Sequence, residues 1–331
     1  MMHTGADWRA TPIVFAALAL LAGGVSISAG GHGAALATTT QTQGRPPDGP
    51  RAGAQVISAE YREGVFFAKA TINGTGPFWF TVDTGATLTV IDPRTADRLG
   101  IPVRDLGERQ NVGTAAGPTA MGATRRVVIR VGDLAPFAPA RMYVVGVSAN
   151  QELLGHRIDG VLGTDFLMRY VMEFDYRAGA VTAHDARAFS YSGRQEPLSI
   201  SLAGNRLLAP STLTLPDGER VSPLLLIDTG SNTRLILNAP FVRKHRLVER
   251  FPSARMTASY GINGLTTSPL IESRSLRLGT AIVDRPNTGL SRETAGLHAS
   301  AAFDGIVGAE LLKAFRVIVD YPRRQLIVAP K

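Results

Sequence analysis

The chain has 331 residues, of which 44% are hydrophobic and 19% are charged, and this composition excludes a largely disordered protein. Its net charge of +8 comes mostly from arginine, and the arginines are scattered rather than gathered in one basic stripe, which argues against a nucleic-acid-binding protein. The sequence has no cysteine, so its fold must rely on a hydrophobic core without disulfides.

The N-terminal segment has the features of an export signal. His3 and Arg9 give a weakly positive start, residues 13–22 form a short apolar core, and small residues follow. We expect residues 1–37 to be a signal peptide of a periplasmic or secreted protein. An uncleaved N-terminal anchor stays open as an alternative, and it would give a loose association with the membrane. Residues 38–54, rich in Thr, Gln, Gly and Pro, predict a flexible linker.

Short strands dominate the rest of the chain. Residues 64–72 and 78–82 predict two strands joined by a hairpin turn at Asn73-Gly74, and residues 207–215 and 224–227 repeat this plan. Frequent Gly and Pro between the strands indicate an all-β fold. The few short helices are expected at residues 93–99, 164–170, 239–245 and 309–315.

Three short sequences occur twice with the same spacing. The separations 228 − 83, 304 − 159 and 320 − 175 all equal 145 residues. The pairs are Asp83-Thr84-Gly85 with Asp228-Thr229-Gly230, Asp159-Gly160 with Asp304-Gly305, and Asp175-Tyr176 with Asp320-Tyr321. The chain is therefore a tandem duplication. We expect lobe 1 at residues 55–190 and lobe 2 at residues 191–331, each carrying one carboxylate on a glycine turn.

These motifs resemble those of the aspartic proteases of the pepsin and retropepsin kind. The loop from Asp83 to Ala86 is similar to the retroviral form, and the loop from Asp228 to Ser231 is similar to the pepsin form. Residues 303–308 resemble the strand that crosses beneath the catalytic loop in pepsins. The resemblance covers about residues 56–330. It implies two retropepsin-like β-barrel lobes that form a pepsin-like pseudo-dimer.

The resemblance also implies that Asp83 and Asp228 form a catalytic dyad. Two carboxylates about 3 Å apart cannot both ionise, so they share one proton, and the pair can take a proton from water while giving one to a carbonyl oxygen. Aspartic proteases are the general example of this effect. Gly85 and Gly230 would permit the tight turns. By resemblance, Thr84 and Thr229 would lock the two loops together. Two buried turn aspartates without catalysis remain the alternative.

The residue after each catalytic glycine differs between the lobes. A hydroxyl at Ser231 can donate to the ionised carboxylate and favour its charged form, whereas Ala86 cannot. We therefore expect a dyad less acidic than that of pepsin, suited to mildly acidic or neutral pH.

The resembled family closes its cleft with a glycine-rich hairpin flap. One candidate lies in lobe 1 and contains Gly113 and Gly117; the other lies in lobe 2 and contains Tyr260, Gly261 and Gly264. Tyr260 is similar to the flap tyrosine of pepsins, but pepsins carry that residue in the first lobe. A simple packing role for Tyr260 stays open.

These features predict an aspartic endopeptidase that acts on peptide or protein substrates as a monomer, with no cofactor. The six histidines show no metal-ligand spacing, and no histidine base is suggested near Ser231 for nucleophilic catalysis. The alternative is a non-catalytic envelope protein that retains the protease fold to bind peptides. Retention of both Asp-Thr-Gly motifs argues against it, because binding alone needs no paired acids.

Overall fold

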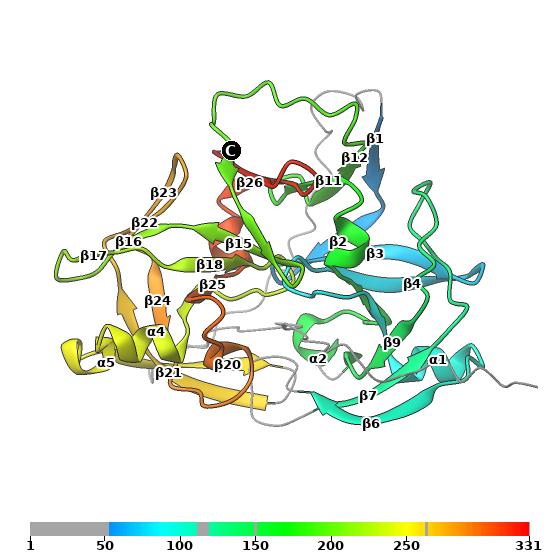
Figure 1. The fold of residues 1–331 in the computed structure, drawn as a ribbon, viewed down its shortest axis with the longest axis horizontal. Helices are drawn as coiled ribbons and strands as arrows, with labels where there is room; N and C mark the ends of the chain where they lie inside the picture. The colour runs from blue at the N-terminus through cyan, green and yellow to red at the C-terminus, as the bar shows by residue number, and fades with distance from the viewer. Residues whose placement is uncertain (1–52, 111–118, 149–150, 262–263, 331) are drawn as a thin grey trace, which may run out of the picture.

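The computed structural model describes residues 53–110, 119–148, 151–261 and 264–330. The expected signal peptide and most of the expected linker lie outside these residues. Within them the chain is mostly β-sheet with short helices, so the predicted all-β fold class is confirmed (Figure 1). No helix in the described part of the chain has the length and apolar character needed to cross a membrane.

All the predicted helices are present, each shorter than expected. The first begins at Pro93 because the side chain of Asp92 caps it by accepting from the backbone N–H of Arg94 at 2.9 Å. These helices are α1 (Pro93–Arg98), α3 (Thr164–Leu167), α4 (Ala239–Lys244) and α6 (Ala309–Leu312). The described residues also contain three short helices that were not predicted, namely α2 (Gln151–Leu154), α5 (Leu247–Arg250) and the 3-10 helix η2 (Leu297–Ala299). Each is about one turn long, too short for an amphipathic pattern to develop.

The first half of the chain, up to residue 190, builds a nine-stranded sheet. Its strand order is β2-β3-β4-β10-β5-β9-β7-β6, with β8 paired to β3. The strands are β2 (Ala59–Arg62), β3 (Val65–Ile72), β4 (Thr75–Val82), β5 (Val90–Ile91), β6 (Arg104–Gln110), β7 (Thr119–Thr124), β8 (Ile129–Arg130), β9 (Met142–Val145) and β10 (Gly160–Leu162). The predicted turn at Asn73-Gly74 joins β3 to β4 with positive φ at both residues.

The second half, from residue 191, builds an eight-stranded sheet in the order β14-β15-β18-β25-β19-β24-β21-β20, and a separate four-stranded sheet in the order β17-β16-β22-β23. The strands of the larger sheet are β14 (Ser201–Ala203), β15 (Arg206–Pro210), β18 (Leu224–Ile227), β19 (Leu235–Leu237), β20 (Arg255–Gly261), β21 (Gly264–Glu272), β24 (Asn287–Leu290) and β25 (Gly305–Val307). Those of the smaller are β16 (Thr212–Thr214), β17 (Arg220–Val221), β22 (Ser275–Leu278) and β23 (Ala281–Asp284).

The sequence repeat is also a repeat of strand register. β4 pairs in parallel with β10 so that Val82 lies opposite Leu162. β18 pairs in parallel with β25 so that Ile227 lies opposite Val307, which is the same pairing shifted by 145 residues. Each Asp-Thr-Gly loop therefore leaves its sheet at an equivalent point.

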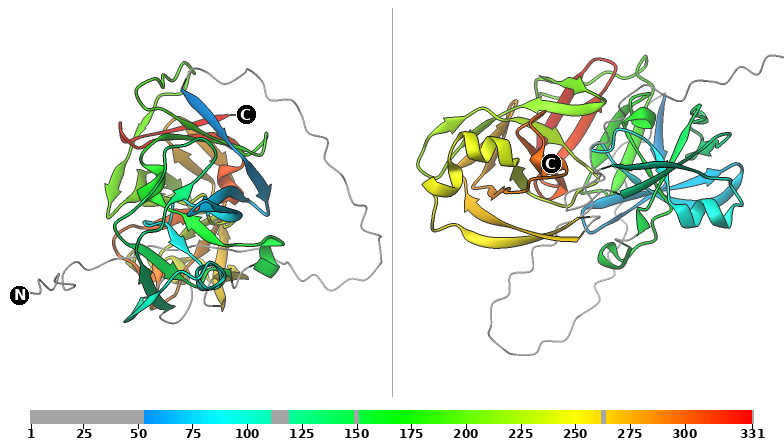
Figure 2. Two further views of the ribbon diagram at one scale, coloured as in Figure 1. Left: turned by 90° about the vertical axis from the view of Figure 1, so that its right-hand side faces the viewer. Right: turned by 60° about the horizontal axis from the view of Figure 1, so that its bottom comes forward.

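A third large sheet takes strands from both halves. Its order is β1-β12-β11-β26-β27-β13, and β11 pairs antiparallel with β26 at its centre. The strands are β1 (Ala54–Ile57), β11 (Val171–Asp175), β12 (Ala180–His184), β13 (Leu198–Ser199), β26 (Phe315–Asp320) and β27 (Gln325–Pro330). This sheet lies at the top of Figure 1, and the right view of Figure 2 shows the blue-to-green first half beside the yellow-to-orange second half.

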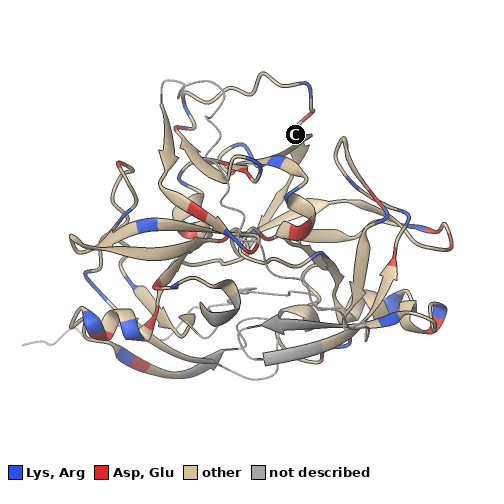
Figure 3. Ribbon diagram, turned by 180° about the vertical axis from the view of Figure 1, so that it is seen from behind, with Lys and Arg blue, Asp and Glu red and all other residues tan. Residues whose placement is uncertain are grey.

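Successive side chains of β3 point to opposite faces of the sheet and enter two separate apolar clusters. Phe66 and Ile72 point into the main core, which extends across both halves, and Phe67 points into a separate apolar cluster with Ala86. Burial of each phenylalanine contributes on the order of 1.5–3 kcal/mol. Charged residues are spread over the ribbon of both halves (Figure 3).

Candidate active site

The two Asp-Thr-Gly loops begin where the two parallel strand pairs end. The backbone N–H of Asp83 donates to the carbonyl of Leu162 at 3.0 Å, and that of Asp228 donates to the carbonyl of Val307 at 3.0 Å. Both aspartates are fully buried at 0% exposure. The apolar strands thus carry one carboxylate from each half into the interior.

The structure brings these two carboxylates together across the two halves. A Cβ atom built on Gly85 would overlap the carboxylate of Asp228, and one built on Gly230 would overlap the carboxylate of Asp83. Each aspartate therefore packs directly on the glycine of the opposite loop, where any other residue would place a side chain.

Thr84 and Thr229 connect the loops through four reciprocal hydrogen bonds. The N–H of Thr84 donates to Oγ1 of Thr229 at 3.1 Å, and the N–H of Thr229 donates to Oγ1 of Thr84 at 3.0 Å. Each hydroxyl then donates onward, Thr84 to the carbonyl of Ile227 at 2.7 Å and Thr229 to that of Val82 at 2.9 Å. Both threonines are fully buried, so these bonds fix the relative position of the loops without competition from water.

Each aspartate has one anchored oxygen and one unpartnered oxygen. Oδ1 of Asp83 accepts the N–H groups of Gly85 at 2.7 Å and Ala86 at 3.0 Å, and Oδ1 of Asp228 accepts the N–H of Gly230 at 3.0 Å. Oδ2 of both residues is buried without a hydrogen-bond partner. A shared proton, a water molecule or a substrate oxygen can therefore be bound at the Oδ2 pair.

Burial makes both carboxyls weaker acids than an exposed aspartate. It raises the pKa of Asp83 to about 6, against the opposing effect of the N–H bonds from Gly85 and Ala86. Burial, followed by the negative charge of Asp83, raises the pKa of Asp228 well above its usual value. Because the two groups titrate as a pair, the dyad holds one proton near neutral pH.

The hydroxyl of Ser231 does not contact the dyad as the sequence had suggested. Its Oγ shares a hydrogen bond with Oγ1 of Thr233 at 2.8 Å and accepts the N–H of Thr233 at 3.3 Å. It is the backbone N–H of Ser231, not its hydroxyl, that helps to stabilise the charged form of Asp228. In this structure, the hydroxyl of Ser231 therefore does not produce the difference in aspartate acidity that we expected between the Ser231 loop and the Ala86 loop.

Both candidate flap hairpins lie on the side of the molecule opposite the six-stranded sheet (Figure 1). In the second half, β20 and β21 pair up to the tip, with Tyr260 opposite Leu265 and Gly261 opposite Gly264. The side chain of Tyr260 lies outside the described residues. In the first half, β6 pairs with β7, while Gly113 and Gly117 at the tip also lie outside them.

The repeated Asp-Gly pairs hold the crossing strands in place. Asp159 accepts the N–H of Trp79 at 2.8 Å, and Asp304 accepts the N–H of Leu224 at 2.8 Å, the same contact 145 residues later. Asp159 also forms ion pairs with Arg98 and Arg157. The sequence repeat singled out Asp159 and Asp304, but it did not predict the hydrogen bonds that they form.

Two further buried residues, Tyr176 and Tyr321, were also repeated in the sequence without an assigned role. Burial raises the pKa of Tyr176, with smaller contributions from Tyr61 and then Asp228. Burial also raises the pKa of Tyr321, with a smaller contribution from Asp83. Each phenol thus lies within electrostatic range of the aspartate from the other half.

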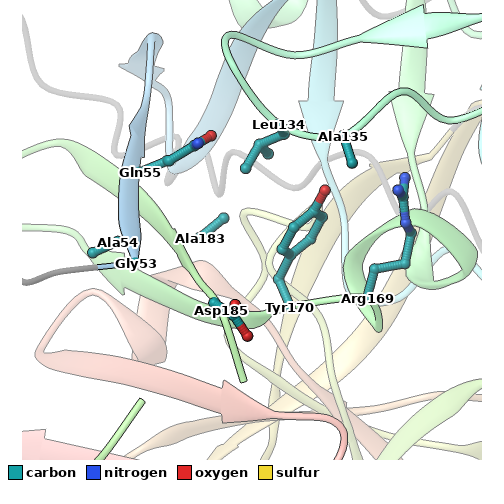
Figure 4. A pocket seen from close by; sticks show the side chains of 9 residues that line it. All are labelled: Gly53, Ala54, Gln55, Leu134, Ala135, Arg169, Tyr170, Ala183 and Asp185. Carbon is teal, nitrogen blue, oxygen red and sulfur yellow. The ribbon is translucent and has the colours of Figure 1, made fainter. Parts of the chain in front are cut away.

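A separate cavity of about 500 Å³ lies away from the dyad, and none of its lining residues belongs to an Asp-Thr-Gly loop (Figure 4). It is bordered by Gln55 of β1, Ala183 of β12, and Arg169 and Tyr170, which follow α3. Among the described residues, no group of three or more His, Asp or Glu side chains is arranged to hold a metal ion.

Residues 68–166 match the family model described as aspartyl protease, a segment that contains the first Asp-Thr-Gly loop and ends before the second. A search of curated proteins finds no matching sequence. The family match supports a retropepsin-like relationship and, in general terms, a protease function.

Proposed function

Since residues 68–166 match the aspartyl protease family model, we propose that the whole chain is an aspartic endopeptidase whose active site is shared by its two halves. The observation that carries this proposal is the reciprocal contact between the loops. Gly85 lies on Asp228, Gly230 lies on Asp83, and the two threonines exchange hydrogen bonds. Two turn aspartates with only a structural role would not require their unpartnered oxygens to be buried together.

The proposed reaction uses a water molecule between the two Oδ2 atoms. The ionised carboxylate accepts a proton from this water while the protonated carboxyl donates its proton to the carbonyl oxygen of the substrate, and a tetrahedral diol forms. The carboxyl that took the proton from water then gives it to the leaving amine as the C–N bond breaks. At the same time a diol hydroxyl returns a proton to the other carboxylate. The dyad ends with one proton, as it began, so the cycle needs no cofactor.

The two hairpins are proposed to close over an extended peptide. β20 and β21 remain paired to Gly261 and Gly264, which supply the backbone freedom of a lid. We also propose that the protein is exported through its N-terminal segment and acts as a monomer, since both catalytic loops come from one chain.

Hydrolysis of unfolded casein by the purified protein tests this proposal. We expect new peptides by mass spectrometry, inhibition by the dyad ligand pepstatin, and no inhibition by the metal chelator EDTA. Pepstatin binding without any hydrolysis would favour the non-catalytic peptide-binding protein. Hydrolysis that EDTA abolishes and pepstatin does not affect would contradict the aspartic mechanism.

A further inference from the structure

Arg206 occupies a position where the repeat places an aliphatic residue in the first half. Arg206 begins β15 and lies opposite Ala203, as Val65 begins β3 and lies opposite Arg62. Two residues further along each strand, Leu208 lies opposite Leu226, and Phe67 lies opposite Thr81. Thr81 is the counterpart of Leu226, 145 residues earlier. Arg206 and Val65 are therefore equivalent positions in the two halves.

Arg206 lies at the level of the catalytic loop. Because β15 and β18 are antiparallel, moving two residues back from Leu208 corresponds to moving two residues forward from Leu226, which leads to Asp228. The ladder thus places the start of β15 beside the second aspartate.

The turn before this position has a counterpart in the first half that packs on the opposite catalytic loop. In the first half, Gly64 packs so closely on Asn232, which follows the second Asp-Thr-Gly, that an added Cβ would be 2.9 Å from the Cβ of Asn232. In the second half, Gly204 and Asn205 form the equivalent turn, again with positive φ at both residues. Thr87, which follows the first Asp-Thr-Gly, is the counterpart of Asn232 in the repeat, and its Oγ1 is buried without a partner.

The side chain of Arg206 is largely buried against apolar neighbours. The residue is only 7% exposed, and its guanidinium lies over the ring of Phe303, which packs with Leu208 and Leu226. Its Nε has no hydrogen-bond partner, and no carboxylate of the described residues forms an ion pair with it. At the equivalent position Val65 is fully buried in an apolar cluster, so the fold itself does not need a charge there.

We propose that Arg206 forms the base of an anionic substrate subsite beside the dyad, and that it binds a carboxylate of the peptide. This inference rests on the proposed endopeptidase function. An unpaired buried charge is costly, and a carboxylate offers a guanidinium two parallel hydrogen bonds, so a bound acidic group would recover this cost. Because the related subsite has Val65, the preference for an acidic group should occur on one side of the scissile bond only.

A peptide series tests this proposal. A cleaved peptide is varied one position at a time with Glu or its neutral analogue Gln, and a parallel pair has a free or amidated C-terminus. We expect one position, on one side of the cleaved bond, where Glu raises kcat/KM at least about tenfold over Gln. If only the free C-terminus gives the increase, the subsite binds a terminal carboxylate instead of an acidic side chain.

Variants at Arg206 identify the residue responsible. Arg206→Met should reduce the Glu-to-Gln ratio to about one while cleavage of the Gln peptide persists, and its melting temperature should not fall, because an unpaired buried charge is removed. Arg220→Met, which changes an exposed arginine of β17, should leave the ratio unchanged. An unchanged ratio in Arg206→Met, or an equal loss on both peptides, would overturn the proposal.

Failure of the proposed function gives a different result. If the wild-type protein cleaves none of the peptides, the endopeptidase assignment fails, and the subsite is then tested by binding. Stabilisation of the wild-type protein against heat by the Glu peptide, but not by the Gln peptide or in Arg206→Met, would support the anionic subsite. Equal stabilisation by both peptides, or none, would overturn it.

Discussion

Gly85 lies directly against the carboxylate of Asp228. A Cβ atom on Gly85 would be 2.5 Å from Oδ2 and 2.7 Å from Oδ1 of Asp228, closer than a Cβ atom approaches other groups in proteins. Gly230 has the same relation to Asp83. The missing side chain of each glycine is thus what allows the opposite aspartate to reach its partner, in addition to permitting the turn itself.

Gly85→Ala and Gly230→Ala should therefore each move the opposite carboxylate and lower kcat/KM by at least about a hundredfold, because small displacements of catalytic groups have large effects. Gly146→Ala is a matched control, since no atom would lie within 4 Å of its added Cβ. Steady-state kinetics on a casein-derived peptide measures both. Near-normal activity in Gly85→Ala would show that the two loops are not apposed as described.

The threonine contacts predict coupled losses of stability. Thr84→Val and Thr229→Val should each lower the free energy of unfolding by about 1–3 kcal/mol, because each leaves a buried N–H and a buried carbonyl without a partner. The double variant should lose less than the sum, since both residues belong to one network. Urea denaturation measures these changes, with the exposed Thr280→Val as control. Strictly additive losses would argue against a shared network.

The raised pKa values of the two aspartates predict an unusual pH–rate profile. As the pH falls through about 6, the pair, which already holds one proton, binds a second one at Asp83. No ionised carboxylate then remains to accept a proton from water. The acid limb of kcat/KM should therefore lie near pH 6, well above the usual carboxyl pKa of 3.8. Rates measured from pH 3 to pH 9 on one peptide give this limb. A limb near pH 4 would contradict the burial argument.

The same shift predicts how stability depends on pH. The folded protein binds the Asp228 proton more tightly than the unfolded chain, so the free energy of unfolding falls as the pH rises above about 3.8. Asp228→Asn cannot ionise and should not show this loss. Its melting temperature relative to the wild-type protein should increase from pH 4 to pH 8. A constant difference over this range would mean that the carboxyl is not desolvated.

Ser231→Ala should have little effect on the acid limb, because the hydroxyl of Ser231 is bonded to Thr233 and not to the dyad. The pH–rate profiles of this variant and of the wild-type protein are to be compared on the same peptide. A clear upward shift of the acid limb in the variant would show that the hydroxyl acts on Asp228 in the working enzyme.

Local sequence was sufficient to predict the framework of the site. An apolar run ending in Asp-Thr-Gly predicted β4 and β18, and Asp92-Pro93 is a recognisable helix start. The contacts between the halves were harder to predict, because they depend on strand register and rotamers. Ser231 has a partner two residues away that competes with the dyad. Arg206 follows a turn of polar residues, and only the register of β15 against β18 places it beside Asp228.

Separate removal of the two carboxyls tests the shared dyad most directly. Asp83→Asn and Asp228→Asn, each purified as a folded monomer, are to be assayed on unfolded casein beside the wild-type protein. We predict that each variant loses hydrolysis to the level of the blank, because one carboxyl cannot serve as both acid and base. Substantial turnover by a monomeric Asp228→Asn variant would contradict a dyad formed by both halves, and turnover by a dimer of that variant would indicate that two first halves form the site instead.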